Sequence, residues 1–187
     1  MVDPDLFRSV LGRFASSVTV LSARDASGRD RGMTVSAFAS VSLSPPLVLA
    51  CVDHVASIHP TLMTEEWIGV SILAEGQEAC SRRFADPDAD RFDDLEIERG
   101  RHGTALLIGA AAHLECRIVA RHDGGDHTIF IAVVEHVNDA DIRAEMTVRH
   151  AMIAVAVDAS PRVVGEHRTA RQRTVRERQC ASVYQPR

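Results

Sequence analysis

The 187-residue sequence contains no lysine, so all 21 of its basic residues are arginine. We attribute this bias to codon usage and draw no functional conclusion from it. Aromatic residues make up only 4%, whereas hydrophobic residues (45%) and charged residues (25%) lie near the averages of globular proteins. The chain is therefore suited to one domain with a sizeable core. Its net charge of −5 gives no reason to expect nucleic acid as a partner.

Membrane and disulfide signals are also lacking. No apolar run approaches the roughly 18 residues of a membrane-spanning helix, and the first residues carry no basic segment typical of a signal peptide. The four cysteines, Cys51, Cys80, Cys116 and Cys180, form no CxxC pair. Isolated thiols indicate a reducing compartment and argue against a disulfide framework or a structural zinc site. We therefore expect a soluble, cytoplasmic protein with no membrane partner.

The motifs of several common enzyme classes are absent. The sequence has no GxGxxG or Walker loop, no HExxH metal site and no GxSxG nucleophile turn. Its nine histidines show no metal-ligand spacing, and the seven carboxylates from Asp86 to Glu98 have no histidine among them. We interpret these carboxylates as a solvated face and expect no metal site. Cys51 and Cys116 lie in apolar strand contexts, where we expect buried, unreactive thiols.

What the sequence does contain is a strong strand pattern in residues 32–52. Hydroxyl and apolar residues alternate over Gly32–Leu43, which predicts one half-buried strand. Ser44-Pro45-Pro46 ends this strand, because proline donates no N–H to a ladder. The continuous apolar run Leu47–Val52 predicts a second strand that is buried on both faces.

The hydroxyl face of the first predicted strand admits two interpretations. Small hydroxyls beside a buried strand form a surface on which a flat, phosphate-bearing ligand could lie. The same face could also contact water alone. The residues concerned are Thr34, Ser36, Ser40 and Ser42.

The remaining elements are short. Asp3-Pro4, followed by apolar residues at helical spacing, predicts a helix that reaches Phe14. Further short helices are predicted after a cap at Ser57, with Pro60 in the first turn, and over Gln77–Phe84. Strands are predicted over residues 17–23, 67–73, 104–121 (bent at Gly109), 127–137 and 151–157, with a hairpin turn at residues 123–126.

These elements predict the fold class and the domain organisation. Strands joined by hairpin turns and interrupted by helices indicate a mainly β protein with short helices, built as an antiparallel barrel with helices at its rim. Residues 1–158 form this domain. In residues 159–187 the apolar periodicity disappears and arginine dominates, which predicts a mobile tail.

Three segments of the chain resemble the flavin reductase family, the small reductase partners of two-component flavin-dependent monooxygenases. They are GMTVSAFASVSLSPPLVLACV, IGVSILAEGQ with CSRRFA, and GAAAHLECRIVARHDGGDHTIFIAVVEHV. The resemblance covers roughly Leu6 to Val137, and the SLSPP turn and the GDH hairpin make it specific. It implies a split β-barrel homodimer that binds FMN or FAD near the subunit interface. It also implies NADH or NADPH as hydride donor and a monooxygenase partner that receives the reduced flavin.

The resemblance also implies roles for individual residues. His127, in the GDH segment, corresponds to the catalytic residue on the nicotinamide side, where it would position the nicotinamide or close the site. Backbone N–H groups near Asp53 and Thr34 would stabilise the charge that develops at the flavin pyrimidine edge. Flavin contacts are implied at Met33, Thr34, Ser36, Ser40, Val41, Cys51, Val52, Asp53, Ser57, Arg83 and Phe84.

Three features depart from the family pattern. Ser71 stands where members usually carry asparagine, and Ala132 replaces a frequent glycine. The usual ending, a PLLY strand followed by an RGxY segment, is absent. Two alternatives to a flavin reductase therefore stay open: an FMN-binding electron-transfer flavoprotein, and an inactive split-barrel subunit that serves only as an interaction module.

Overall fold

The computed structural model describes residues 2–86 and 91–138, which form three short helices and nine strands. The helices are α1 (Pro4–Leu11), α2 (His59–Thr64) and α3 (Glu78–Ala85), and none of these described helices is long enough to cross a membrane. The strands are β1 (Thr19–Arg24), β2 (Asp30–Val35), β3 (Phe38–Leu43), β4 (Pro46–Asp53), β5 (Trp67–Ile72), β6 (Ile97–Arg99), β7 (Ala105–Leu107), β8 (Ala112–Asp123) and β9 (His127–Asn138). The predicted strand 151–157, the predicted domain boundary at residue 158 and the predicted tail lie outside the described residues.

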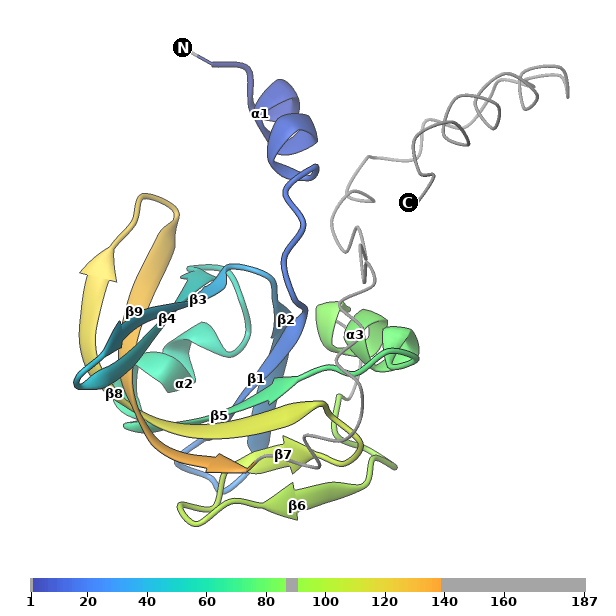
Figure 1. Ribbon diagram of the computed structural model, residues 1–187, viewed down its shortest axis with the longest axis vertical. Coiled ribbons are helices and arrows are strands. Elements are labelled where there is room, and N and C mark those ends of the chain that lie inside the picture. Colours follow the sequence, from blue (N-terminus) through green and yellow to red (C-terminus); the bar gives the residue numbers. More distant parts are fainter. Residues whose placement is uncertain (1, 87–90, 139–187) are drawn as a thin grey trace, which may run out of the picture. The chain divides into compact units, whose positions relative to one another are not determined.

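Seven of the strands form one antiparallel sheet in the order β2-β1-β5-β8-β9-β4-β3. The sheet is strongly curved and partly encloses α2, whereas β6 and β7 form a separate two-stranded sheet (Figure 1). Shifts in the β8–β9 register at Glu115/Cys116 and Ile118/Ala120 help to bend the two longest strands. β2 and β3 are the edges of the sheet, so the barrel is open. The prediction of a mainly β fold with short helices is confirmed.

The main hydrophobic core lies between the curved sheet and α2. Alternate residues of β4 reach this core, and the last of them, Val52, is 0% exposed. The α2 region contributes Ile58 and Leu62, which are also almost completely buried. Full burial of one such side chain contributes about 1.5–3 kcal/mol. The helix therefore holds the two halves of the open sheet together.

A smaller core forms around α3. Phe84 of α3 is fully buried and packs with Val20 of β1 and Leu107 of β7. Val20 precedes Leu21, which belongs to the main core, and successive strand residues point to opposite faces. The small core therefore lies on the other face of β1 and attaches α3 and β7 to it.

The prediction of one strand over Gly32–Leu43 is wrong, because the structure has two strands that separate at Ser36 and Ala37. β2 pairs with β1, whereas β3 pairs with β4 at the other edge of the sheet. The alternation of residue types continues through the break and so does not reveal it. The apolar face of β3 is also not buried, since Leu43 is 96% exposed and Val41 is 49% exposed.

Two further strand predictions need correction. β4 alternates between buried and half-buried positions instead of burying both of its faces. The predicted long strand over 104–121 is two strands, β7 and β8, joined by a turn in which Gly109 adopts a φ of 79°. Glycine adopts positive φ without a steric penalty, so Gly109 reverses the chain instead of bending one strand.

Local capping and turn signals give a mixed outcome. Asp3 caps α1 as predicted, since its Oδ1 accepts hydrogen bonds from the N–H groups of Asp5 (3.0 Å) and Leu6 (2.9 Å). The β8–β9 hairpin is also confirmed, and the N–H of Gly124 donates to the carbonyl oxygen of His127 (2.9 Å). Ser57 does not cap α2, which has no side-chain cap.

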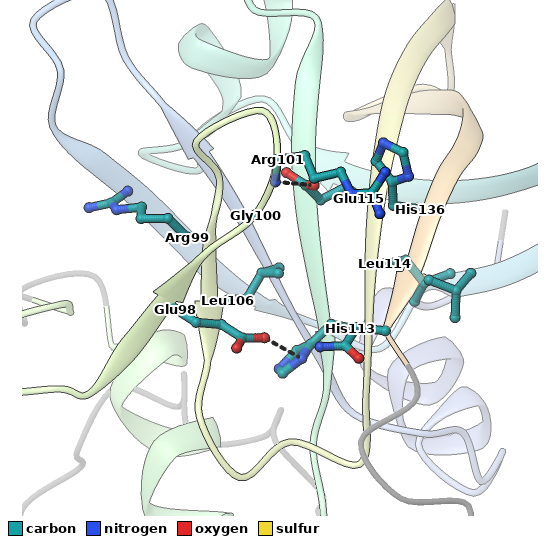
Figure 2. Close-up of a pocket in the computed structure, with 11 residues that line it drawn as sticks. Glu98, Arg99, Gly100, Arg101, Leu106, His113, Leu114, Glu115 and His136 are labelled. Atoms are coloured by element: carbon teal, nitrogen blue, oxygen red, sulfur yellow. Dashed lines mark hydrogen bonds and ion pairs between the residues drawn. The ribbon is translucent and has the colours of Figure 1, made fainter.

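A buried carboxylate fastens the connection between β6 and β7 to β8. Glu115 is 3% exposed and accepts a hydrogen bond from the N–H of Arg101 (2.6 Å; Figure 2). It also accepts hydrogen bonds from the N–H of His102 (3.1 Å) and the hydroxyl of Thr104 (2.7 Å). Burial raises the pKa of Glu115, but these hydrogen bonds together lower it further than burial raises it. Glu115 is therefore an ionised structural residue.

Replacement of Glu115 by glutamine should lower the free energy of unfolding by about 1–3 kcal/mol at pH 7, because a charged acceptor of three hydrogen bonds is lost. The folded-state pKa is depressed, so this stabilisation is present above the ordinary pKa of glutamate and is lost as the pH falls through the folded-state pKa. Urea unfolding should therefore show that the difference in free energy of unfolding between the wild type and Glu115→Gln narrows below about pH 4.

Glu135→Gln is the matched control. Glu135 forms a partly exposed ion pair with Arg117, and its loss should change the free energy of unfolding by less than about 1 kcal/mol. Equal losses in the two variants at pH 7 would contradict the structural role assigned to Glu115.

Candidate functional site

Several of the predicted site residues meet where β4 ends and β9 begins. The antiparallel register places Asp53 beside His127 and Val52 beside Thr128. The N–H of His54 donates to the carbonyl oxygen of Asp126 (3.0 Å), which extends the pairing into the β8–β9 turn. The tight turn thus fixes the point at which His127 enters the sheet.

The backbone of β4 offers a hydrogen-bond donor at this end of the sheet. The register between β3 and β4 stops at Ala50, and the N–H of Cys51 then donates to the carbonyl oxygen of Ala37 (3.0 Å). N–H groups two residues apart in a strand point to the same side. The N–H of Asp53 therefore points past the end of β3, where it can donate to a polar atom of a ring that lies across the strand ends.

Arg91 is a candidate site residue that the sequence analysis did not name. Its guanidinium donates to the carbonyl oxygen of Gly32 and to the hydroxyl of Ser57 (3.2 Å), and its Nε donates to the carbonyl oxygen of Asp86 (2.9 Å). Partial burial lowers the pKa of Arg91, and the nearby charge of Asp86 opposes this shift. Arg91 thus connects β2, the loop before α2 and the segment after α3.

A second arginine, Arg83, lies on α3 itself. The guanidinium of Arg83 donates to the carbonyl oxygen of Asp93, two residues after Arg91. Arg91, Ser57 and Arg83 together supply the charged and hydroxyl donors that bind phosphate in proteins. This donor set fits the phosphate of a flavin nucleotide.

β2 lies tightly against α3 beside these arginines. The hydroxyl of Thr34 donates to the carbonyl oxygen of Ser81 (2.7 Å). A Cβ atom added to Gly32 would lie 2.8 Å from a ring carbon of Phe84 and 2.9 Å from one of Phe92. Only glycine allows so close an approach, because a larger residue would push β2 away from the helix. The position of Thr34 and its neighbours relative to Arg91 therefore depends on Gly32.

The predicted flavin contacts differ in accessibility. The side chains of Val52 and Phe84 are 0% exposed, so Val52 presents only its backbone to a ligand and Phe84 supports the site by packing. The half-buried residues are Met33, Thr34, Cys51, Asp53 and Arg83, and the exposed ones are Ser36, Ser40, Val41 and Ser57. The hydroxyls at the start of β3 are therefore open to a ligand.

Of the two thiols predicted to be buried and unreactive, Cys116 is buried, whereas Cys51 is only half-buried, so its predicted full burial is wrong. Burial raises the pKa of Cys51, and burial followed by the charges of Glu115 and Glu135 raises the pKa of Cys116 to about 12. Both thiols are therefore protonated at neutral pH, and neither is a nucleophile.

His127 is held in one tautomer by its neighbour. Its Nδ1 lies 2.6 Å from Oδ1 of Asp126, and this hydrogen bond lowers the pKa of Asp126. A carboxylate only accepts hydrogen bonds, so Nδ1 carries the proton. In the neutral ring, Nε2 then has a free lone pair that can accept a hydrogen bond from an amide N–H.

A cavity of about 300 Å³ lies elsewhere, between the β6–β7 connection and the ends of β8 and β9 (Figure 2). It is lined by none of the predicted site residues. Of its buried polar groups, Glu115 is fully occupied and the Nε2–H of His113 donates to the carbonyl oxygen of Leu107 (2.8 Å), whereas Nδ1 of His113 lies 3.2 Å from Glu98 and has no hydrogen-bond partner among the described residues. Because no predicted site residue lines this cavity, we assign it no part in the site.

The two internal departures from the family pattern have structural explanations. Ser71 is 1% exposed, and its hydroxyl accepts a hydrogen bond from the N–H of Leu107 (3.0 Å). Ser71 therefore attaches β7 to β5. Ala132 is buried in the main core, where it is paired with Val48 and Ile118.

Comparisons with known proteins identify the family of this chain. The family model described as flavin reductase like domain matches residues 11–154. The chain is 44% identical over 142 residues to an NADH-dependent FAD reductase of Streptomyces globisporus, covering 72% of this chain and 77% of that protein. It is 38% identical over 133 residues to the reductase component of a 4-nitrophenol 4-monooxygenase/4-nitrocatechol 2-monooxygenase of Rhodococcus opacus, covering 71% of each chain.

Solved structures support the same assignment. An NADH:FAD oxidoreductase of Streptomyces globisporus C-1027, solved in complex with NAD and FAD fragments, has a TM-score of 0.69 and 43% sequence identity, covering 74% of this chain and 86% of that chain. The resemblance that the sequence predicts is thereby confirmed, and the chain belongs to the family of flavin reductase like domain proteins.

Proposed function

We propose that this chain is an NADH-dependent flavin reductase that supplies reduced FMN or FAD to a partner monooxygenase. Relatives named as NADH-dependent reductases and as reductase components of monooxygenases support this function. The observation that carries it in this chain is the pairing of Asp53 with His127, which sets a strand-end N–H donor beside a half-buried imidazole. The reduced, isolated thiols among the described residues support a cytoplasmic location.

The flavin would bind along the rim formed by β2, the start of β3 and the end of β4. Arg91, Ser57 and Arg83 would hold its phosphate, and Ser36 would bond its ribityl chain. The N–H of Asp53 would donate to the pyrimidine edge of the ring, where negative charge develops. When bound, the flavin supplies the two-electron chemistry by accepting a hydride from NADH.

His127 would position the nicotinamide. Because Nδ1 donates to Asp126, Nε2 is left to accept a hydrogen bond from the carboxamide N–H of the nicotinamide. The side chain is 39% exposed, so a second ring can reach it from solvent. Its contribution is orientation of the donor, since hydride transfer needs no protein nucleophile.

We also infer a homodimer in which a second copy covers the edge strand β3. Leu43 and Val41 are exposed on this edge beside the predicted flavin residue Ser40. A second copy related by a two-fold axis would bury the same residues on both chains. This arrangement would also place the flavin near the subunit interface.

The proposed function is tested by mixing purified protein with NADH and free FMN or FAD and following the absorbance of the nicotinamide. Repeated turnover of the added flavin is the expected result. Stoichiometric reduction of bound flavin alone would indicate the electron-transfer flavoprotein, and absence of flavin binding would indicate the interaction module.

Arg91→Met should raise the KM for FMN about tenfold or more, because a charged donor to the phosphate is lost. Riboflavin lacks the phosphate, so its KM should be the same in variant and wild type. Arg82→Met, which removes an exposed arginine of α3 that pairs with Glu78, is the matched control and should leave both constants unchanged. An equal rise for FMN and riboflavin would show that Arg91 acts only on the structure of the site.

His127→Ala should raise the KM for NADH about tenfold while the KM for flavin stays within about twofold, because one hydrogen bond to the carboxamide is lost. Asp126→Asn should have a smaller effect in the same direction, since an amide holds the imidazole less firmly than a carboxylate. Asp123→Asn, in the same hairpin, is the control. Steady-state kinetics with each substrate varied in turn measures the KM values of the three variants. An equal rise in the KM values for NADH and flavin would refute the role assigned to His127.

Leu43→Glu should convert the proposed dimer into a monomer, because a charge would be buried at the centre of the interface. Size-exclusion chromatography with light scattering measures the mass. Ile108→Glu, at another exposed apolar residue, is the control and should remain dimeric. A wild-type protein that is monomeric would rule out the proposed interface.

A further inference from the structure

His59, the first residue of α2, makes a side-chain contact with the start of β9. Its Nε2 lies 2.8 Å from the hydroxyl oxygen of Thr128, at hydrogen-bond distance. Thr128 is only 7% exposed and directly follows His127 in the chain. The contact thus joins the helix inside the curved sheet to the residue beside the proposed nicotinamide group.

The imidazole of His59 is enclosed by several elements. The ring of His54 packs against it edge-on with centroids 5.1 Å apart, and the ring of Phe130 of β9 lies at 6.1 Å. The titratable groups that act on it are Asp53, the last residue of β4, and His54, which follows it. Burial, and then His54, lower the pKa of His59, while Asp53 opposes the shift. The ring is therefore neutral at pH 7.

We propose that His59 is a positioning residue for NADH. Through its hydrogen bond to Thr128, His59 holds the neighbouring His127 in place. This inference rests on the proposed function. It assigns His59 no contact with either substrate.

The position of α2 explains why this contact is effective. Ile58 and Leu62, on either side of His59, are almost completely buried in the main core, so the start of the helix is firmly anchored. At the start of β9, the side chain of His127 also bonds to Asp126, whose side chain is 88% exposed at the tip of the hairpin. The His59–Thr128 hydrogen bond is partly buried, and a hydrogen bond shielded from water is stronger than one that is exposed. His59 therefore restricts the start of β9 more than Asp126 does.

The chemistry of the pair also allows a graded test. A neutral imidazole nitrogen and a hydroxyl can hydrogen bond in either direction. Glutamine at position 59 keeps a polar group on a side chain of similar reach, whereas alanine removes it. Valine at position 128 removes only the hydroxyl and keeps the shape of threonine, so it tests the hydrogen bond with little risk to folding.

The experiment compares steady-state kinetics of His59→Ala, His59→Gln and Thr128→Val with the wild type. His59→Ala and Thr128→Val should each raise the KM for NADH about five- to tenfold and leave the KM for flavin within about twofold. In His59→Gln the KM for NADH should return most of the way to the wild-type value. His54→Ala is the matched control, since it removes a neighbouring ring but not the bond to Thr128, and its KM for NADH should stay within about twofold.

A double-mutant cycle with His127 makes the test specific to positioning. Once His127 is replaced by alanine, there is no imidazole left to position, so adding Thr128→Val should raise the KM for NADH no further. The inference would be overturned if Thr128→Val and His127→Ala raised the KM for NADH additively, or if the variants raised the KM values for NADH and flavin equally. If His59→Ala does not fold, the Thr128→Val cycle decides the question alone. A wild-type protein that does not turn over NADH would refute the proposed function. If the wild type turns over NADH but the variants keep its KM for NADH, only the role of His59 is refuted.

Discussion

The antiparallel pairing of β4 with β9 is the constraint on which the site depends. The register runs from Leu47 opposite Val133 to Asp53 opposite His127 without interruption. A shift of β4 by one residue would turn the fully buried Val52 towards the other face of the sheet, and a shift of β9 would do the same to Phe130. The hydrophobic core therefore fixes the register, and the register fixes which polar groups meet at the strand ends. The same pairing thus serves both stability and the proposed chemistry.

The sequence predicts the fold well where a local residue pattern determines the backbone. Asp3-Pro4 and the Gly124-Gly125 turn act through hydrogen bonds and backbone angles within a few residues, and both predictions are confirmed. The alternating pattern of Gly32–Leu43 was insufficient, because alternation shows which residues share a face but not which strand is the neighbour. The break at Ser36 and Ala37 exists because β2 and β3 pair at opposite edges of the curved sheet, a long-range fact.

The site was predictable mainly through the family resemblance. Residues such as Asp53 and His127 are brought together by pairing between distant strands, which composition and spacing do not reveal. Arg91 was missed because it lies in a run of carboxylates that resembles a solvated surface, and only the structure shows its bonds to Gly32 and Ser57. The resemblance also places Phe84 at the flavin, and because its ring is buried against β1 and β7, only its backbone can contact a ligand directly.

The protonated state of Cys51 has a consequence for the lifetime of the protein in air. Free reduced flavin reacts with dioxygen and generates hydrogen peroxide, which oxidises cysteine through the thiolate and not through the thiol. Burial raises the pKa of Cys51, so very little thiolate is present at neutral pH even though the side chain lies at the end of β4 beside the proposed flavin. Cys51 would therefore react only slowly with the oxidant that the product of the reductase forms.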